Sequence, residues 1–182
     1  GDVVAINGEA VEAAIREDNA ALADFTTTAS APFNIVYPYT EGLEASHVRF
    51  AAVQPYTEGT FAAASAPMYG YAATAEGGIT MHHLTGIMRF AVKAAEGQNI
   101  TLKSIVITTE GDISGDFAVD CTTGALTPKA NTTNTITYTF AEGEGALSTT
   151  ASEYFFTIPA GSYGEFEVTF NATSGESMTA KF

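Results

Sequence analysis

TITYTF at residues 135–140 and EFEVTF at residues 165–170 indicate the fold class of this chain. In both segments every second residue is apolar, and the residues between are threonine or glutamate. Alternation of this kind puts one face of a strand against a core and the other in water, which is typical of antiparallel sheets. Both segments are therefore predicted to be β-strands.

Two further segments extend this pattern. IMRFAVK (87–93) places Met88, Phe90 and Val92 on one face and Arg89 and Lys93 on the other. NITLKSIVITT (99–109) shifts its apolar phase midway, which predicts a β-bulge near residues 103–104. Glycine-rich turns separate these runs, so residues 84–182 are predicted to form an antiparallel, all-β sandwich.

The N-terminal segment allows two interpretations. Asn7-Gly8 lies between VVAI and EAVEAAI and predicts a type I′ hairpin, because that turn needs two residues with positive φ. Residues 9–23 are rich in alanine and have glutamates near their start, so a helix is the alternative. We prefer a second hairpin that turns at Arg16–Asn19, since a helix directly after Asn7-Gly8 fits that turn poorly.

The composition limits the classes of partner. The 182 residues carry seven basic and 21 acidic side chains, which gives a formal net charge of −14. This charge repels phosphate backbones and anionic lipid heads, so nucleic acid and bare membrane surface are expected to be poor partners. The length fits one domain, and residues 1–182 are expected to form a single β-sandwich domain with a weak subdivision near 80–84.

One internal repeat occurs: VYPYTEG at 36–42 recurs as VQPYTEG at 53–59. Two copies are too few for a solenoid, which needs at least three units to bury a continuous core. One interpretation is that each copy ends a strand in a Pro-aromatic turn. The other is that Tyr37, Tyr39 and Tyr56 present a surface to a sugar or a protein partner.

Residues with catalytic or metal-binding chemistry are few. His82 and His83 are adjacent, so on a strand they would point to opposite faces and could not easily share a metal ion. Asp112, Asp116 and Asp120 would lie on one strand face, which we interpret as solvated rather than as a calcium site.

The same register would turn Cys121 inward, together with Ile113, Phe117 and Val119, as a small buried hydrophobe. Nucleophile-elbow, phosphate-loop, zinc-protease and dinucleotide motifs are missing from the sequence. We therefore expect a protein that is not an enzyme and that carries no cofactor and no metal.

Several segments, taken in their order along the chain, resemble the fimbrillin family of fimbrial and adhesin-like surface proteins of Bacteroides-type bacteria. These segments are VVAINGEAV (3–11), APFNIVYPYTEG (31–42), QPYTEGTFAAASAPMYGYA (54–72), HHLTGIMRFAVKAAEGQNITLKSIVITTEGDISGDFAVD (82–120) and FFTIPAGSYGEFEVTF (155–170).

The resemblance implies a transthyretin-like, Greek-key β-sandwich and export as a lipoprotein precursor to the cell surface or outer membrane. It also implies a subunit, tip, anchor or adhesin of a surface fibre, in which a strand of one subunit fills a gap in the next. An added strand would satisfy open backbone groups and insert alternate side chains into a groove. The chain would be the N-terminal fimbrillin-like domain of a longer precursor, held at the membrane only through a lipid anchor outside residues 1–182.

We therefore expect a cell-surface fimbrial subunit or adhesin-like structural protein that assembles, or binds partners, by β-strand addition. Its expected partners are other fimbrial subunits, or a protein or glycan on a host or bacterial surface. The alternative is a non-catalytic carbohydrate-binding module of a surface polysaccharide-utilisation system, in which Tyr37, Tyr39, Tyr56, Tyr69 and Tyr71 would supply aromatic surface for stacking on sugars. A hydrolase is a third hypothesis, and it would need two carboxylates that converge in a cleft.

Overall fold

The computed structural model describes residues 2–182 and is built almost entirely from β-strands, as the sequence predicted. Within these residues the only helical segment is the 3-10 turn η1 (Ala63–Ser65), and no helix has the length and apolar character needed to cross a membrane. Two compact units are formed, and each combines segments that lie far apart in the sequence.

Unit 1 comprises the described residues of Gly1–Arg49 together with Pro67–Leu84 and Asp116–Ala130. Its strands, of which β6 and β12 each extend one residue past these bounds, are β1 (Val3–Ile6), β2 (Glu9–Glu12), β3 (Ala14–Ile15), β4 (Ala23–Asp24), β5 (Phe33–Tyr37), β6 (His47–Phe50), β8 (Met68–Ala72), β9 (His82–His83), β12 (Gly115–Val119) and β13 (Leu126–Pro128). They form a five-stranded sheet in the order β2-β1-β5-β8-β9, a three-stranded sheet β13-β12-β6 and the small hairpin β3-β4.

Both N-terminal hairpins form, although the second turns over residues 16–22 and not at Arg16–Asn19 alone. Asn7 and Gly8 have φ values of 50° and 89° and join β1 to β2, with Ile6 opposite Glu9. The helix considered for residues 9–23 does not form, because β3 and β4 pair antiparallel and the chain turns between them. The backbone N–H of Arg16 donates to the carbonyl of Leu22 at 3.0 Å, which closes that turn.

The expectation that Asp112, Asp116 and Asp120 form a solvated strand face was wrong. Asp116 is buried on β12, where its carboxylate accepts two hydrogen bonds from Arg49 at 2.6 and 3.0 Å. Asp112 precedes the strand and accepts a bond from the Thr132 hydroxyl. A bidentate guanidinium supplied from β6 makes burial of the Asp116 carboxylate possible, and the spacing of the aspartates gives no sign of that partner.

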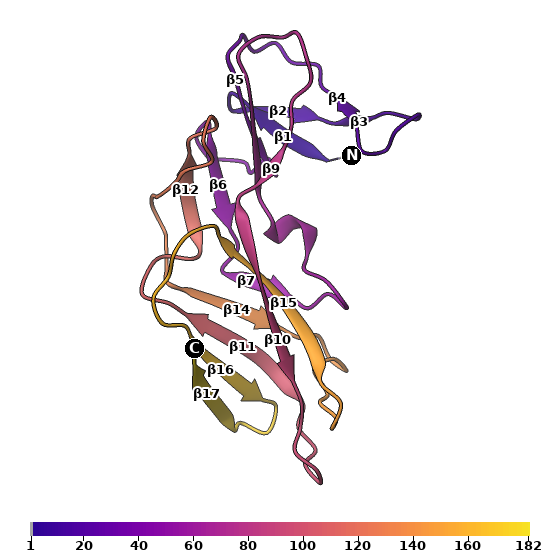
Figure 1. Cartoon of the computed structure of the whole chain (residues 1–182), viewed down its shortest axis with the longest axis vertical. Helices are drawn as coiled ribbons and strands as arrows, with labels where there is room; N and C mark the ends of the chain where they lie inside the picture. The colour runs from indigo at the N-terminus through magenta and orange to yellow at the C-terminus, as the bar shows by residue number, and fades with distance from the viewer. Residues whose placement is uncertain (1) are drawn as a thin grey trace. The chain divides into compact units, whose positions relative to one another are not determined.

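Unit 2 comprises Phe50–Ala66, Thr85–Gly115 and Asn131–Phe182. Its strands are β7 (Val53–Pro55), β10 (Thr85–Val92), β11 (Leu102–Thr108), β14 (Thr135–Thr139), β15 (Ser152–Pro159), β16 (Glu167–Ala172) and β17 (Ser177–Lys181). Five of them form a sheet in the order β17-β16-β11-β14-β7, and β10 and β15 form a separate antiparallel pair. The pair lies across the larger sheet (Figure 1), and the core of the unit lies between them.

The two segments quoted first behave as predicted. TITYTF supplies β14, on which Ile136 and Tyr138 are buried, and EFEVTF supplies the start of β16, on which Val168 and Phe170 are buried. The β-bulge predicted near residues 103–104 is confirmed by a register shift between Leu102 and Ser104 where β11 pairs with β16. Period-two patterning was therefore sufficient to place these strands and their buried faces.

The repeated heptapeptide marks two strand ends. β5 ends within the first copy and β7 within the second, and each is followed by a Thr-Glu-Gly turn. Gly42 and Gly59 have φ values of 81° and 69°, and in both turns the residue after glycine donates its N–H to the threonine carbonyl at 3.3 Å. The repeat thus encodes the same turn twice, once in each unit.

Gln54 of β7 closes one edge of the two-stranded sheet. Its amide oxygen accepts from the backbone N–H of Thr157 at 3.1 Å, and its Nε2 donates to the carbonyl of Thr157 at 2.7 Å. Gln54 and Thr157 are 2% and 0% exposed, so these bonds are shielded from water. A single side chain thereby replaces the strand that would otherwise pair with β15 at this point.

We predict that Gln54→Ala lowers the free energy of unfolding by about 1–3 kcal/mol, because it leaves the N–H and C=O of Thr157 buried without partners. Urea unfolding measures the change. Gln98→Ala is the matched control, since Gln98 is exposed and its loss should change stability by no more than about 0.5 kcal/mol. Equal effects of the two substitutions would contradict this role of Gln54.

Candidate functional site

The candidate site is an open groove of about 430 Å³ in unit 2, between β10 and β17. It is lined by Arg89, Phe90, Ala91, Val92, Lys93, Phe170, Met178, Ala180 and Phe182. Most of this lining is apolar, and all of it comes from strands of unit 2 or from residues directly after them. We call it the β10 groove.

The backbone of β10 is open on the side that faces away from β15. The N–H and the C=O of Thr157 both bond to Gln54, so these two groups point away from β10. Ile87 of β10 lies opposite Thr157, and the two residues therefore form a non-hydrogen-bonded pair. Such pairs alternate along an antiparallel ladder, so Ile87, Arg89 and Ala91 direct their N–H and C=O groups to the free side. These groups are ready to pair with another strand.

β17 shows the same arrangement at the opposite rim. Phe166 and Phe182 exchange two backbone hydrogen bonds, so Thr179 falls in a non-hydrogen-bonded pair and directs its backbone groups away from β16. Met178, Ala180 and Phe182 share the inner face of the sheet with Val168 and Phe170. That face of β17 is the floor of the β10 groove.

The floor of the groove stays partly uncovered because the two strands β10 and β15 are too few to cover the whole face of the five-stranded sheet. Met178 and Phe182 are 59% and 66% exposed, whereas Val168 on the neighbouring strand is fully buried. The ring of Phe90 on β10 lies 5.9 Å from that of Phe182 and 6.4 Å from that of Phe170. β10 thus covers the inner edge of the floor and leaves the outer edge in water.

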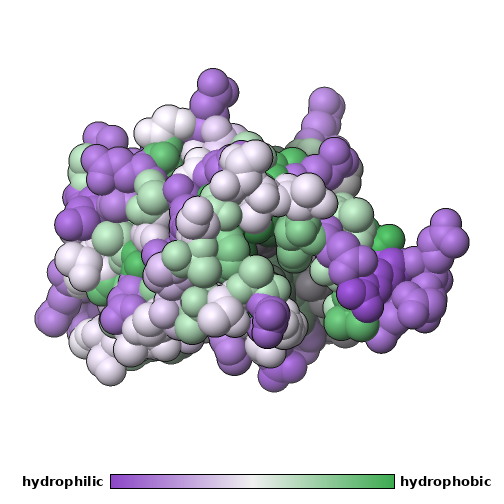
Figure 2. Space-filling view, turned by 90° about the horizontal axis from the view of Figure 1, so that it is seen from above, coloured by the Kyte–Doolittle hydropathy of each residue, from purple (hydrophilic) through white to green (hydrophobic). Residues whose placement is uncertain are grey.

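Two large exposed apolar side chains, Met178 and Phe182, line this groove, and a third, Ile87, lies on β10 outside the lining. Large exposed apolar side chains among residues 2–182 are Ile15, Leu22, Val53, Tyr71, Ile87, Met178 and Phe182. Three of the seven, Ile87, Met178 and Phe182, belong to β10, to β17 or to the residue after β17. Figure 2 views the molecule from above Figure 1, a face on which hydrophobic and hydrophilic side chains are mixed.

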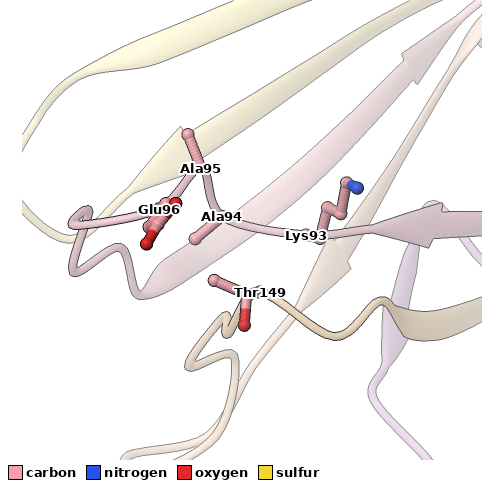
Figure 3. A pocket seen from close by; sticks show the side chains of 5 residues that line it. All are labelled: Lys93, Ala94, Ala95, Glu96 and Thr149. Atoms are coloured by element: carbon pink, nitrogen blue, oxygen red, sulfur yellow. The ribbon is translucent and has the colours of Figure 1, made fainter.

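A second depression, also of about 430 Å³, adjoins the end of β10 and shares Lys93 with the β10 groove. It is lined by Lys93, Ala94, Ala95, Glu96 and Thr149 (Figure 3). The Lys93 amine points away from the Glu96 carboxylate, and the rest of the lining is small. This depression holds one carboxylate, whereas glycoside hydrolysis needs two.

The predicted surface residues Tyr37, Tyr39 and Tyr56 lie in different units. Tyr37 and Tyr39 belong to unit 1, where the Tyr37 ring packs on the core and its hydroxyl donates to Asp2 at 3.4 Å. Burial raises the pKa of Tyr37, and the Asp2 carboxylate raises it further.

Tyr56 is part of the aromatic core of unit 2. Its ring contacts those of Tyr138, Phe140 and Tyr154 at centroid distances of 6.3, 5.6 and 6.0 Å. Tyr138 is 1% exposed, and this burial raises its pKa. Tyr37 at the end of β5 and Tyr56 directly after β7 are therefore both packed against the core of their own unit.

Metal-binding residues do not gather anywhere along residues 2–182, in which no group of three or more His, Cys, Asp or Glu is placed to hold an ion. His82 and His83 lie on the short strand β9, opposite Tyr69 and Met68 respectively. The His82 ring stacks on Tyr69 at 5.4 Å.

Sequence reasoning missed the β10 groove, although its signals were present. IMRFAVK already gave the correct inner and outer faces of β10, and the last residues alternate Met178, Ala180 and Phe182 with Thr179 and Lys181. Alternation shows which face is apolar but does not show that the strand has a neighbour on one side only. The number of strands in each sheet depends on long-range pairing, which the pattern does not contain.

The inward position predicted for Cys121 is confirmed, since this residue is 4% exposed. Burial raises the pKa of its thiol, so little reactive thiolate forms at neutral pH.

We predict that Cys121 reacts with a thiol reagent far more slowly in the folded protein than in 6–8 M urea, roughly a hundredfold or more. The same assay on Thr150→Cys in a Cys121→Ala background is the control, because residue 150 is exposed. Comparable rates at both positions would contradict the burial of Cys121.

No protein-family model matches this chain, and no curated protein matches it either. The fimbrillin resemblance therefore stays a prediction that depends on the segments quoted for it.

Proposed function

We propose that this protein is a cell-surface structural protein, fimbrial or adhesin-like, that joins its partners by accepting a β-strand along β10. One observation carries the proposal: the open backbone edge of β10 lies directly beside an apolar groove with an exposed floor. A strand that pairs with Ile87, Arg89 and Ala91 would insert every second side chain over Phe170, Met178 and Phe182.

The free-energy gain would come from two sources. The added strand would bond to the N–H and C=O groups on the side of β10 that has no strand neighbour among residues 2–182, which also gives it a defined register. Its side chains would cover Met178 and Phe182, and each of these burials would contribute about 1–2 kcal/mol, given the exposed fractions of 59% and 66%. A stable complex needs more than this, so an occupant would have to fill the length of the groove.

The proposed location rests on the fimbrillin resemblance. Under this proposal the protein is exported as a lipoprotein precursor and works at the cell surface or outer membrane. Its partners would be other fimbrial subunits, or a surface protein or glycan of a host or bacterium. The groove supports the strand-accepting part of this proposal, since it provides the gap that such a partner would fill.

A second candidate function, non-catalytic carbohydrate binding, is favoured by one observation in unit 1. Tyr69, Tyr71 and His82 share a face of the β5-β8-β9 sheet, where Tyr71 is 40% exposed. The Tyr69 ring is held against Gly124, whose missing side chain leaves room for it; a Cβ there would lie 2.6 Å from the ring. A fixed, exposed aromatic surface of this kind suits stacking on a sugar ring.

We predict that, if this surface binds carbohydrate, Tyr71→Ala weakens binding on a glycan array by about tenfold or more, the loss expected when a stacking ring is removed. Ile15→Ala is the control, because Ile15 is also exposed and lies on the separate β3-β4 hairpin. A buried tyrosine such as Tyr163 would not serve, because it packs on the core of unit 2. An array without any signal would remove the carbohydrate function and leave strand addition as the proposal.

The strand-accepting function predicts a specific change in amide hydrogen exchange. The probe is the neutral peptide acetyl-Ser-Val-Thr-Val-Thr-Val-Thr-Val-Ser-amide, added in excess to the full chain. We expect the amides of Ile87, Arg89 and Ala91 to exchange at least tenfold more slowly with the peptide bound, because they gain carbonyl partners. An N-methylated form of the peptide, which cannot donate these bonds, should give no protection.

Two proline variants locate the binding edge. Ala91→Pro removes an N–H on the free side of β10 and should abolish protection, whereas Thr179→Pro removes the corresponding N–H of β17 and should leave it intact. Circular dichroism checks that both variants are folded. Loss of binding in Thr179→Pro alone would place the added strand on β17, and equal protection by the methylated peptide would refute strand addition altogether.

A further inference from the structure

We propose that the strand accepted by β10 alternates apolar residues with acidic ones, the acidic residues facing outward over Arg89 and Lys93. This inference rests on the proposed function and specifies the class of its partner: an extended peptide segment with negative charges on one face. It is carried by the positions of two cations at the open edge, in a chain whose net charge is −14.

The two cations lie four residues apart at the open edge: Arg89 is on β10, and Lys93 is the residue directly after the strand. Arg89 and Ala91 lie on the outer face of β10, while Phe90 and Val92 face the core, and the alternation of the strand, if continued by one residue, puts Lys93 on the outer side as well. A residue directly across from Arg89 on an added antiparallel strand would have its Cβ about 4.5–5.5 Å away, close enough for an ion pair. The residue across from Lys93 would lie four positions along the added strand.

Both cations remain able to receive a further negative charge. Arg89 donates to Glu153 on β15 at 3.1 Å through Nη1, and its side chain is still 61% exposed. Among residues 2–182 the ion pairs within 4.0 Å do not include Lys93, and Figure 3 shows its amine turned away from Glu96. Lys181, on the other rim, is already bonded to Glu165 at 2.7 Å on the outer face of the large sheet.

The inner face of the same strand would be apolar. Residues across from Phe90 and Val92 would point into the groove, whose remaining lining is Phe170, Met178, Ala180 and Phe182. A volume of about 430 Å³ accepts several side chains of medium size, such as valine or isoleucine. Polar residues at these positions would lose water without gaining hydrogen-bond partners.

The experiment compares three peptides of the form acetyl-Ser-Val-X-Val-X-Val-X-Val-Ser-amide, in which X is Glu, Thr or Lys. Their affinity for the full chain is measured by fluorescence polarisation in 150 mM NaCl. At this ionic strength charges more than about 8 Å away are largely screened, so the distant acidic residues contribute little. We expect the glutamate peptide to bind about three- to tenfold more tightly than the lysine peptide, the range for two exposed cross-strand ion pairs.

Lys93→Glu should abolish this preference, because it leaves Arg89 beside one new carboxylate, and Lys103→Glu should not. Both substitutions change the net charge equally, but Lys103 lies on β11, away from the groove lining.

If the three peptides bind equally, or the lysine peptide binds more tightly, the charge preference is wrong while strand addition stands. If none binds and Ile87, Arg89 and Ala91 gain no protection, the proposed function fails with it. Peptide-independent association of the chain with itself would instead identify a second copy as the occupant and overturn the acidic-strand proposal.

Discussion

The mismatch between two sheets governs unit 2: a two-stranded sheet must cover one face of a five-stranded sheet. The side chains of the five-stranded sheet that pack against this pair, such as Ile107 on β11 and Ile136 on β14, are fully buried, because β10 and β15 cover them. Toward β17 the cover ends and the apolar face continues. The β10 groove is therefore a consequence of strand number, and no special residue is needed to create it.

The two edges of the two-stranded sheet differ: the edge at β15 is closed by a side chain, and the edge at β10 is open to a further strand. At β15 the amide of Gln54 occupies the place of a neighbouring strand and satisfies the backbone of Thr157. At β10 the corresponding groups of Ile87, Arg89 and Ala91 face the groove. Exposed edges with an apolar surface beside them tend to pair with other chains, and proteins normally protect them. An edge that is closed on one side and open on the other directs such pairing to one strand.

The sequence allowed the local features to be predicted and left the long-range ones hidden. The strands of TITYTF and EFEVTF, the Asn7-Gly8 hairpin and the bulge near Lys103 all follow from neighbouring residues, and all are confirmed. Asp116 was misinterpreted because its partner Arg49 lies 67 positions earlier, and a carboxylate in an alternating strand reads as solvated without it. The groove escaped prediction for a related reason: Met178 and Phe182 show an apolar face, but only the completed sheet shows that nothing covers it. Local patterns determine which face is buried, and tertiary pairing determines how far the cover extends.

The interleaving of the two units has a consequence for synthesis of the chain. Unit 1 needs residues 116–130 to complete the sheet that contains β6, and unit 2 needs β16 and β17 at the end of the chain. At roughly 5–20 residues per second, several seconds pass between translation of Arg49 and that of Asp116. Neither unit can close while the first half of the chain is all that has left the ribosome. Closure of unit 1 is thus deferred until residues 116–130 have been made, and closure of unit 2 until β17 has been made.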